Sequence, residues 1–405
     1  MHELQLKMKN SAVLFLFLVL FISACGGKES QQDASLKLEE AFIHYELGMD
    51  YYGIGEMDKA VAEWEEAVKL NPDSEARHML GLAYYSQKNT DGARKEWEYI
   101  LSKDGKNFMA LNNLGNLYKD LKDPDKALDF FSRAVAANPK EAMPFYNMGI
   151  VYKEKGDQKL AKEKFLKALE LDPQLSIAMF EMGNILWAEG EREQAAPYFK
   201  KLAGGEGRKD PGFDPIVAGY SSLGQLYLES GNFDESEKNL KKGIEVQPSN
   251  PTLHYSLGNL YEIMEKKEEA LKQYKLTLQM DPAFPHVYNG LGNLYAEMGG
   301  GHLDEAEGLL LKGMEIDPGL KDHFLDTLGW VYYKQGKLDE AMAKVEEAIG
   351  LTPADKKESL SNKRYHLGII YKAKGDQEKA LENFKKAIEL YPGGESAKKA
   401  KKNLG

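Results

Sequence analysis

The sequence predicts an all-α protein of about ten stacked helix-turn-helix repeats, closed by a C-terminal cap helix. Gly115 and Gly149 lie 34 residues apart, and the landmarks of Leu111–Pro139 recur in the same order in Phe145–Pro173. A fixed period of this length is typical of helical repeats, each of which buries its apolar face only by stacking on its neighbours. The composition, with 42% hydrophobic and 29% charged residues, is that of a soluble globular chain.

The net charge and the cysteine content exclude several kinds of partner and site. The formal charge of -11 argues against nucleic-acid binding, because proteins that track phosphates need clustered Lys and Arg. The single cysteine leaves no internal disulfide and no cysteine cluster for zinc or iron–sulfur. We therefore expect no nucleic-acid partner and no metal.

Residues 1–24 have the pattern of a secretory signal peptide. The stretch from Ser11 to Ala24 is almost entirely apolar, and Lys7 and Lys9 precede it. A helix needs about 20 apolar residues to cross a bilayer, so this run is too short to span it comfortably. A basic start followed by a short apolar run is instead typical of a secretory signal.

The end of this run, Ile22, Ser23, Ala24 and Cys25, resembles the lipobox of bacterial lipoproteins. The resemblance implies cleavage before Cys25, transfer of diacylglycerol to its sulfur and acylation of the new amino terminus by a fatty acid such as palmitate. Three acyl chains suffice for stable membrane attachment. An ordinary signal peptide with a chance cysteine is the alternative. Gly26 is not the aspartate that retains many enterobacterial lipoproteins at the inner membrane, so the resemblance favours the periplasmic face of the outer membrane.

Residues 25–40 are expected to form a flexible tether behind the lipidated cysteine. The segment from Gly26 to Lys37 is small and polar and shows no hydrophobic period. Such a composition is typical of a linker that holds a folded part away from its anchor.

Residues 41–394 repeat one pattern, in which Leu-Gly-x2-Tyr is followed by Ala-x3-Phe-x2-Ala-x4-Pro. This pattern resembles the tetratricopeptide repeat. The resemblance implies a superhelical solenoid in which the first helices of the repeats line a concave groove. Its glycine occurs ten times, at Gly48, Gly81, Gly115, Gly149, Gly183, Gly224, Gly258, Gly292, Gly329 and Gly368.

Each landmark has a packing reason. The glycine and the alanine of a repeat lie where its two helices approach most closely, so larger side chains would hold the helices apart. Only the sixth repeat departs from the alanine, with Ser236. Proline ends the second helix, because the residue before proline is disfavoured in helical geometry.

The period lengthens most between Gly183 and Gly224, which are 41 residues apart. The excess lies in an insertion at 204–216, which is either a surface loop or a hinge. We expect repeats 1–5 at 41–203 and repeats 6–10 at 217–394. Residues 395–405 fit a cap helix with a polar outer face.

No catalytic motif is present. The sequence contains no HExxH metal spacing, no glycine-rich phosphate loop and no GxSxG elbow, and its eight histidines are scattered. The repeats, the cap, the tether and the signal account for the whole chain. We therefore expect neither an enzyme nor a cofactor.

The predicted binding surface is the concave groove. An amide both donates and accepts hydrogen bonds, so a row of asparagines can match an extended peptide backbone. Aromatic side chains add contact area at low entropic cost. Asparagine is also common at these positions of the family whatever the ligand. The candidate residues are Asn112, Asn113, Asn116, Asn147, Asn184, Asn259, Asn293, Tyr85, Tyr146, Trp187, Tyr255 and Tyr333. Lys119 and Lys153 stand near the asparagines, as a clamp for a terminal carboxylate would require.

The functional expectation is a membrane-anchored scaffold of the bacterial envelope that binds a protein or peptide. The resemblance extends to lipoproteins that assemble pilus secretins, adapt peptidoglycan hydrolases or support polysaccharide export, and nothing in the sequence chooses among these. The alternative is a receptor or carrier for a small or polymeric ligand, such as a glycan, in the aromatic groove.

Overall fold

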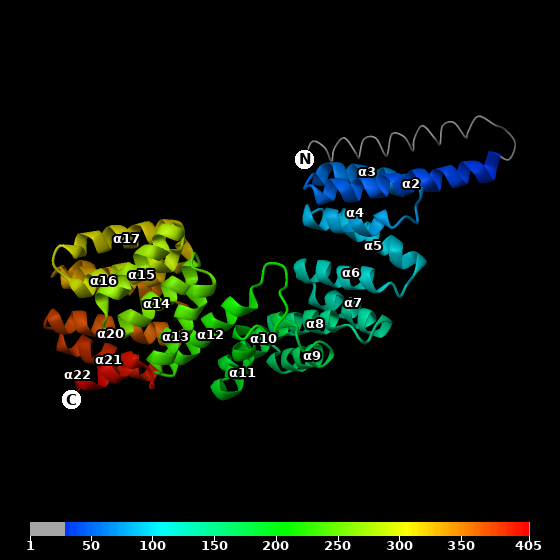
Figure 1. Cartoon of the computed structure of the whole chain (residues 1–405). Coiled ribbons are helices and arrows are strands. Elements are labelled where there is room, and N and C mark those ends of the chain that lie inside the picture. The colour runs from blue at the N-terminus through cyan, green and yellow to red at the C-terminus, as the bar shows by residue number, and fades with distance from the viewer. Residues whose placement is uncertain (1–28, 405) are drawn as a thin grey trace. The chain divides into compact units, whose positions relative to one another are not determined.

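The computed structural model describes residues 29–404, and over this range the chain is all-α. It contains 21 α-helices, one short 3-10 helix and no strand within the described residues. The predicted signal peptide and Cys25 lie outside this range. The chain divides into two compact units, unit 1 up to Ile185 and unit 2 from Leu186 onward. Both are helical stacks (Figure 1).

Each repeat is an antiparallel pair, a first helix and a second helix. In unit 1 the pairs are α2 (Glu29–Gly53) with α3 (Met57–Leu70), α4 (Ala76–Ser86) with α5 (Thr90–Lys103), α6 (Phe108–Asp120) with α7 (Pro124–Ala137), and α8 (Ala142–Glu154) with α9 (Gln158–Leu171). The boundary between the units falls inside α10 (Ser176–Ala188).

Unit 2 continues the same arrangement. After α11 (Arg192–Ala203), its pairs are α12 (Pro215–Glu229) with α13 (Phe233–Val246), α14 (Pro251–Ile263) with α15 (Lys267–Met280), α16 (Pro285–Met298) with α17 (His302–Ile316), α18 (Lys321–Lys334) with α19 (Leu338–Leu351), and α20 (Lys357–Ala373) with α21 (Gln377–Leu390). The 3-10 turn η1 (Pro318–Leu320) precedes α18, and α22 (Glu395–Leu404) closes the chain.

The repeated glycines lie where the two helices of a repeat touch. A Cβ atom added at Gly149 would lie 2.5 Å from Cε1 of Phe165, and one at Gly258 would lie 2.6 Å from Cδ1 of Tyr274. Both aromatic rings are fully buried. The exceptional Ser236 is accommodated because its buried hydroxyl donates to the backbone carbonyl of Gly224 at 2.7 Å.

Side-chain caps begin five of the ten second helices, α5, α7, α9, α13 and α21. Asp123 and Asp157 accept hydrogen bonds from backbone amides three residues ahead, at 3.2 and 3.0 Å. These caps satisfy amide groups that the first turn of a helix leaves unpaired. Most turns between the helices of a repeat place a glycine at positive φ, but Lys88, Lys122 and Glu265 occupy that conformation in three of them.

The first helix begins earlier than the sequence led us to expect. Helix α2 extends back to Glu29, so most of the expected tether is helical. The physical reason is the lack of a helix-breaking residue after Gly27, in a segment with Glu, Gln, Ala, Leu and Lys that sustain a helix.

The 204–216 insertion lies wholly within unit 2. Gly219 of α12 packs directly on the end of α11, where an added Cβ would lie 2.7 Å from the carbonyl oxygen of Phe199. Lys209 pairs with Asp214 at 3.3 Å inside the insertion. Whether this segment acts as a hinge stays a prediction.

Candidate functional site

Side chains of consecutive first helices meet on one side of each unit, which we call the inner face of that unit. In unit 1 the Nδ2 of Asn147 donates to the Oδ1 of Asn112 at 3.3 Å, which joins α8 to α6. Asn147 is only 4% exposed. This amide is therefore a structural link between repeats, which differs from the expectation of a solvated groove residue.

Other amides of the unit 1 inner face are open. Asn113 and Asn116 are half-buried on α6, and their side chains form no hydrogen bond with any described residue. Asn184 on α10 is in the same state. Each of these amides can therefore offer a donor and an acceptor to a ligand without giving up an internal bond.

The polar neighbours of these amides are paired. The hydroxyl of Tyr85 donates to Asp120, and burial together with this carboxylate raises the pKa of Tyr85 well above its ordinary value. Lys153 forms an ion pair with Glu181 at 2.6 Å, and Lys119 lies 3.9 Å from Asp120. Because both lysines already face a carboxylate, they do not form an open clamp for a terminal carboxylate.

The inner face of unit 2 is built around rings. Tyr255 contacts Phe284 and His286, with ring centroids 5.3 and 6.0 Å apart. Burial raises the pKa of Tyr255 to about 12, so its phenol stays neutral. On the next repeats Trp330 stacks on Tyr333 and on His366, each at 4.9 Å.

Carboxylates hold these rings in place. The indole N–H of Trp330 donates to Glu297 at 2.7 Å, and that of Trp187 donates to Glu229 at 2.8 Å. His366 Nδ1 lies 3.0 Å from Oδ1 of Asp326. Each of these contacts joins one repeat to another, so the rings are oriented before any ligand arrives.

The amides of unit 2 are less available than those of unit 1. Asn293 donates to Glu262, which also accepts from Tyr274 at 2.7 Å. Burial raises the pKa of Glu262. The Oδ1 of Asn289 is buried without a hydrogen-bond partner among the described residues, whereas Asn259 is half-buried with an unpaired side chain.

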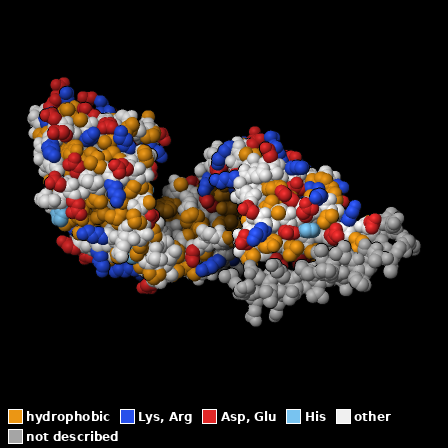
Figure 2. Space-filling model, turned by 90° about the horizontal axis from the view of Figure 1, so that it is seen from above, with side chains coloured by type: hydrophobic (Ala, Val, Ile, Leu, Met, Phe, Trp, Pro, Cys, Tyr) orange, Lys and Arg blue, Asp and Glu red, His pale blue; other side chains and the backbone are white. Residues whose placement is uncertain are grey.

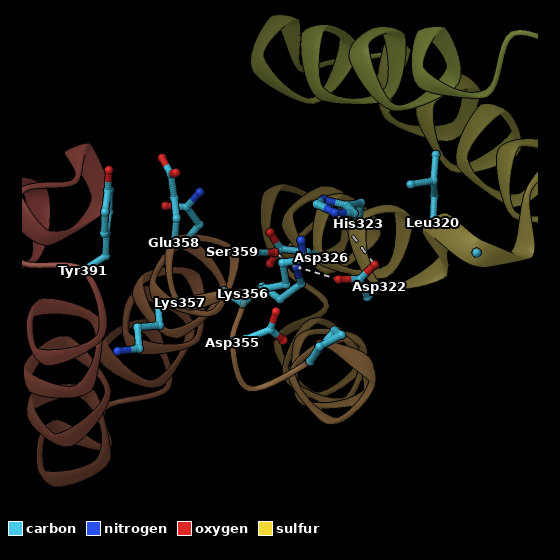
Figure 3. A pocket seen from close by; sticks show the side chains of 14 residues that line it. Leu320, Asp322, His323, Asp326, Asp355, Lys356, Lys357, Glu358, Ser359 and Tyr391 are labelled. Atoms are coloured by element: carbon cyan, nitrogen blue, oxygen red, sulfur yellow. Dashed lines mark hydrogen bonds and ion pairs between the residues drawn. The ribbon is translucent and has the colours of Figure 1, made fainter. Parts of the chain in front are cut away.

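A polar pocket of about 830 Å³ opens at the start of α18 and α20. Lys363, which is 1% exposed, donates to the hydroxyl of Ser359 at 2.6 Å and pairs with Asp322 at 3.2 Å. Figure 3 shows His323 and Asp326 near Asp322 and Ser359, with Tyr391 on the opposite wall. The lining offers four carboxylates, three lysine ammonium groups, a serine hydroxyl, the amide of Asn362, an imidazole and a phenol ring.

Sequence reasoning missed the gathering of His286, His323 and His366 on the unit 2 inner face. His286 and His323 each lie six residues before the glycine of consecutive repeats. This shared position was the sequence signal that could have predicted their common face. The described residues contain no group of three or more His, Cys, Asp or Glu placed to hold a metal ion. Over the same range no helix is long and apolar enough to cross a membrane.

Family models for the tetratricopeptide repeat match several segments of the chain. The matched residues are 45–101, 108–141, 144–175, 251–284, 323–355 and 362–393, and a further model described as TPR repeat matches 224–265. Together these segments cover more than half of the chain. No curated protein matches the sequence significantly.

Solved structures of similar fold are distant in sequence. The Cut9–Hcn1 hetero-tetramer of the APC/C matches with 14% identity and a TM-score of 0.51, over 90% of this chain and 76% of that one. The human IFIT1 dimer with m7Gppp-AAAA matches with 16% identity and a TM-score of 0.49, over 90% and 96%. PilF of Pseudomonas aeruginosa matches with 22% identity and a TM-score of 0.45, over 54% and 96%.

The helix pairs, the glycine contacts and the matched segments all point to one family. Proteins of this family bind protein or peptide partners, and the fold is generally a non-catalytic scaffold. The chain belongs to the tetratricopeptide-repeat proteins.

Proposed function

We propose that this protein is a lipid-anchored scaffold of the bacterial envelope, which holds an extended segment of a partner protein on the inner face of unit 1. The observation that carries the proposal is the pair of open amides, Asn113 and Asn116, on one helix of that face. Pilus secretin assembly, adaptation of peptidoglycan hydrolases and polysaccharide export are the settings implied by the resemblance to envelope tetratricopeptide lipoproteins, and the sequence does not choose among them.

The amides suit a peptide main chain for a chemical reason. A main chain alternates donors and acceptors, and a side-chain amide carries both. Tyr85 on α4 adds ring surface beside the amides, and its position is fixed by the bond to Asp120. Such an arrangement recognises backbone more than sequence, as a scaffold with several clients requires.

The groove is tested by crosslinking followed by mutation. A photoreactive p-benzoyl-phenylalanine in place of Leu82, which is half-buried on α4, captures the partner in intact cells. Replacement of Asn113 and Asn116 by alanine then weakens binding of that partner about 30-fold, because each lost hydrogen bond costs about 1 kcal/mol. The matched control replaces two exposed amides, Gln158 and Gln174, which should leave the affinity unchanged.

Thermal unfolding accompanies the affinity measurement. The amides of Asn113 and Asn116 make no internal bond, so the double variant should melt like the parent. A double variant that melts normally and still binds the captured partner at full strength would remove the unit 1 inner face as the binding surface.

The anchor is tested separately. Cys25→Ser removes the sulfur to which the lipid would be attached, so an unprocessed, lipid-free precursor should accumulate. Metabolic labelling with a fatty-acid analogue and the mass of the membrane-extracted protein measure this. Normal maturation and lipid labelling of the variant would contradict the anchor.

A second candidate function rests on the 830 Å³ pocket in unit 2. Its carboxylates, Ser359, Asn362 and the ring of Tyr391 are groups that hydrogen-bond and stack on a sugar, so a small or polymeric ligand such as a glycan would fit there. Titration with chitotetraose and maltohexaose, monitored by calorimetry, tests this role. Saturable binding that Asp326→Ala abolishes would support a receptor or carrier.

A further inference from the structure

The two ends of the repeat array carry opposite charge. Residues 29–75 contain thirteen Asp and Glu against three Lys, a net charge of -10. Residues 356–405 contain thirteen Lys and Arg against six Asp and Glu, a net charge of +7 in a chain whose total is -11. Charge separated in this way produces complementary potentials at the two ends, which steer association between them.

The first-repeat end has a face that no other described helix covers. Further along the array, tyrosines three residues after the repeat glycine donate to a glutamate of the preceding second helix, as Tyr261 does to Glu237 and Tyr371 to Glu346, both at 2.9 Å. The equivalent Tyr51 has no preceding second helix among the described residues, and its hydroxyl forms no hydrogen bond with them.

Apolar side chains are exposed at this same end. Phe42 is 61% exposed and Leu38 is 54% exposed, one turn apart on α2. Glu39, Glu40 and Glu46 are exposed around them. We call this surface the acidic end. Its apolar centre and acidic surround form a docking surface that is incomplete without a cationic partner.

The other end is covered by the cap helix. Ala397 and Ala400 of α22 are fully buried, and the helix packs on α20 and α21. The asparagine Asn403 fixes the end of the helix by accepting from Lys372 at 2.9 Å. The outward side chains of α22 include four exposed lysines, Lys398, Lys399, Lys401 and Lys402. We call this surface the basic cap.

We infer that copies of this chain associate head to tail, with the acidic end of one copy on the basic cap of the next. The lysine ammonium groups would pair with Glu39, Glu40 and Glu46, while their methylene stems cover Phe42 and Leu38. The ring of Phe42 also offers a face for a cation, whereas the Tyr51 ring already has the Lys59 ammonium 5.5 Å from its centroid. Because the two surfaces differ, the contact is heterologous and propagates into open chains unless it closes into a ring.

Charge reversal tests the association of copies and does not require the protein that the unit 1 inner face binds to be identified. Sedimentation equilibrium is measured on residues 26–405, which retain every described helix, at about 50 and 500 mM NaCl. The cap variant carries Lys398→Glu, Lys399→Glu, Lys401→Glu and Lys402→Glu. The end variant carries Glu39→Lys, Glu40→Lys and Glu46→Lys. A control variant changes four exposed lysines elsewhere, by Lys242→Glu, Lys272→Glu, Lys275→Glu and Lys312→Glu.

The parent and the control variant should associate at low salt and dissociate at high salt, because exposed charges are screened. The cap variant and the end variant should each lose at least tenfold in association constant when alone. An equimolar mixture of the two should regain it, since the reversed cap then faces the reversed end. Regain on mixing also shows that both variants are folded.

Three results would overturn the inference. These are a parent that stays monomeric at low salt, a cap variant that associates like the parent, and a mixture that stays monomeric. A monomeric parent that co-sediments with phosphatidylglycerol vesicles, and a cap variant that does not, would assign the basic cap to an anionic lipid surface. None of these results depends on the inner face of unit 1, so the proposed scaffold function is tested independently.

Discussion

The first helices of unit 1 and those of unit 2 use the same repeat positions for different chemistry. Unit 1 presents open amides, such as Asn113 and Asn116, between ion pairs that are already formed. Unit 2 presents a stack of rings, Trp330 with Tyr333 and His366, held by carboxylates. Figure 2 shows hydrophobic side chains at the surface among acidic and basic ones. One scaffold thus carries two kinds of recognition surface.

The two faces differ in the free-energy terms that oppose ligand binding. An open amide is solvated in the free protein and exchanges water for ligand, so it gains little from each bond but loses nothing inside the fold. A ring fixed by Glu297 or Asp326 is ordered before the ligand arrives, which lowers the entropy lost on binding. We therefore expect the unit 1 face to tolerate many sequences and the unit 2 face to be selective.

The largest expected effect comes from disrupting one unit at a time. Gly149→Arg in unit 1 should destabilise the protein by about 3 kcal/mol or more, because even a Cβ would overlap the Phe165 ring. Gly258→Arg should do the same in unit 2 against Tyr274. Hydrogen exchange should show loss of protection centred on α8 and α9 in the first variant and on α14 and α15 in the second.

Coupling in a repeat array is between neighbours, so damage should decrease with distance from the substituted repeat. Uniform protection in either variant, or equal loss along the whole chain, would contradict this account.

The next effect is confined to unit 2 and depends on pH. Burial alone would raise the pKa of Asp322, but the hydrogen bond from Thr352 and the charge of Lys363 hold it below its ordinary value. A lowered pKa in the folded state contributes stability above the unfolded pKa of about 4, and that stability is lost as pH falls through the folded pKa. Asp322→Asn should therefore cost about 2–4 kcal/mol at pH 7, where it leaves Lys363 buried and unpaired.

Urea unfolding between pH 3 and pH 8 measures this dependence. The gap in unfolding free energy between parent and variant should narrow as pH falls below about 4. The exposed Asp339→Asn, which loses only a surface ion pair with Lys374, is the control and should show a small gap at all pH values. If the difference in unfolding free energy between parent and Asp322→Asn stayed constant with pH, ionisation of the Asp322 carboxylate would be ruled out as the source of the stability.

The smallest effect compares the turns of the two units. Lys122 in unit 1 and Glu265 in unit 2 hold positive φ, at 59° each, where most other repeats have glycine. Lys122→Gly and Glu265→Gly should each stabilise by up to about 0.5 kcal/mol, since relief of backbone strain is partly offset by greater chain entropy. Gly156→Ala, at φ 80°, should destabilise by about 1 kcal/mol. The melting temperatures of the three variants, compared with that of the parent, show whether each substitution stabilises or destabilises the fold.

The repeats were predictable because their landmarks are tied to backbone packing. Most of the equivalents of Gly115 recur in the sequence at spacings of 33 or 34 residues. The structure puts nine of the ten against a buried side chain, namely Gly48, Gly81, Gly115, Gly149, Gly224, Gly258, Gly292, Gly329 and Gly368. Even the exception at Ser236 follows the rule, since a small hydroxyl fits where it can donate to Gly224. Local chemistry alone sufficed for these features.

The inner faces were less predictable, because their state depends on neighbours 30 to 40 residues away. Asn147 and Asn116 look alike in the sequence, yet one is buried against Asn112 and the other is open. The pairing of His366 with Asp326 across repeats has no local signal. The start of α2 was missed for a different reason, since a polar segment without an apolar period can still continue a helix.

The ring stack of unit 2 also allows the two units to be distinguished by tryptophan fluorescence. Trp64 and Trp97 are fully shielded in unit 1, so their emission should lie toward the blue and change only on unfolding. Trp330 stacks on His366 and Tyr333 on the inner face of unit 2, so a ligand bound at these rings should change its emission. The chain has four tryptophans. The red edge of the emission should therefore report ligand binding at the ring stack of unit 2, and the blue edge should report unfolding of unit 1. A single fluorescence titration can therefore follow two separate events in one unlabelled protein.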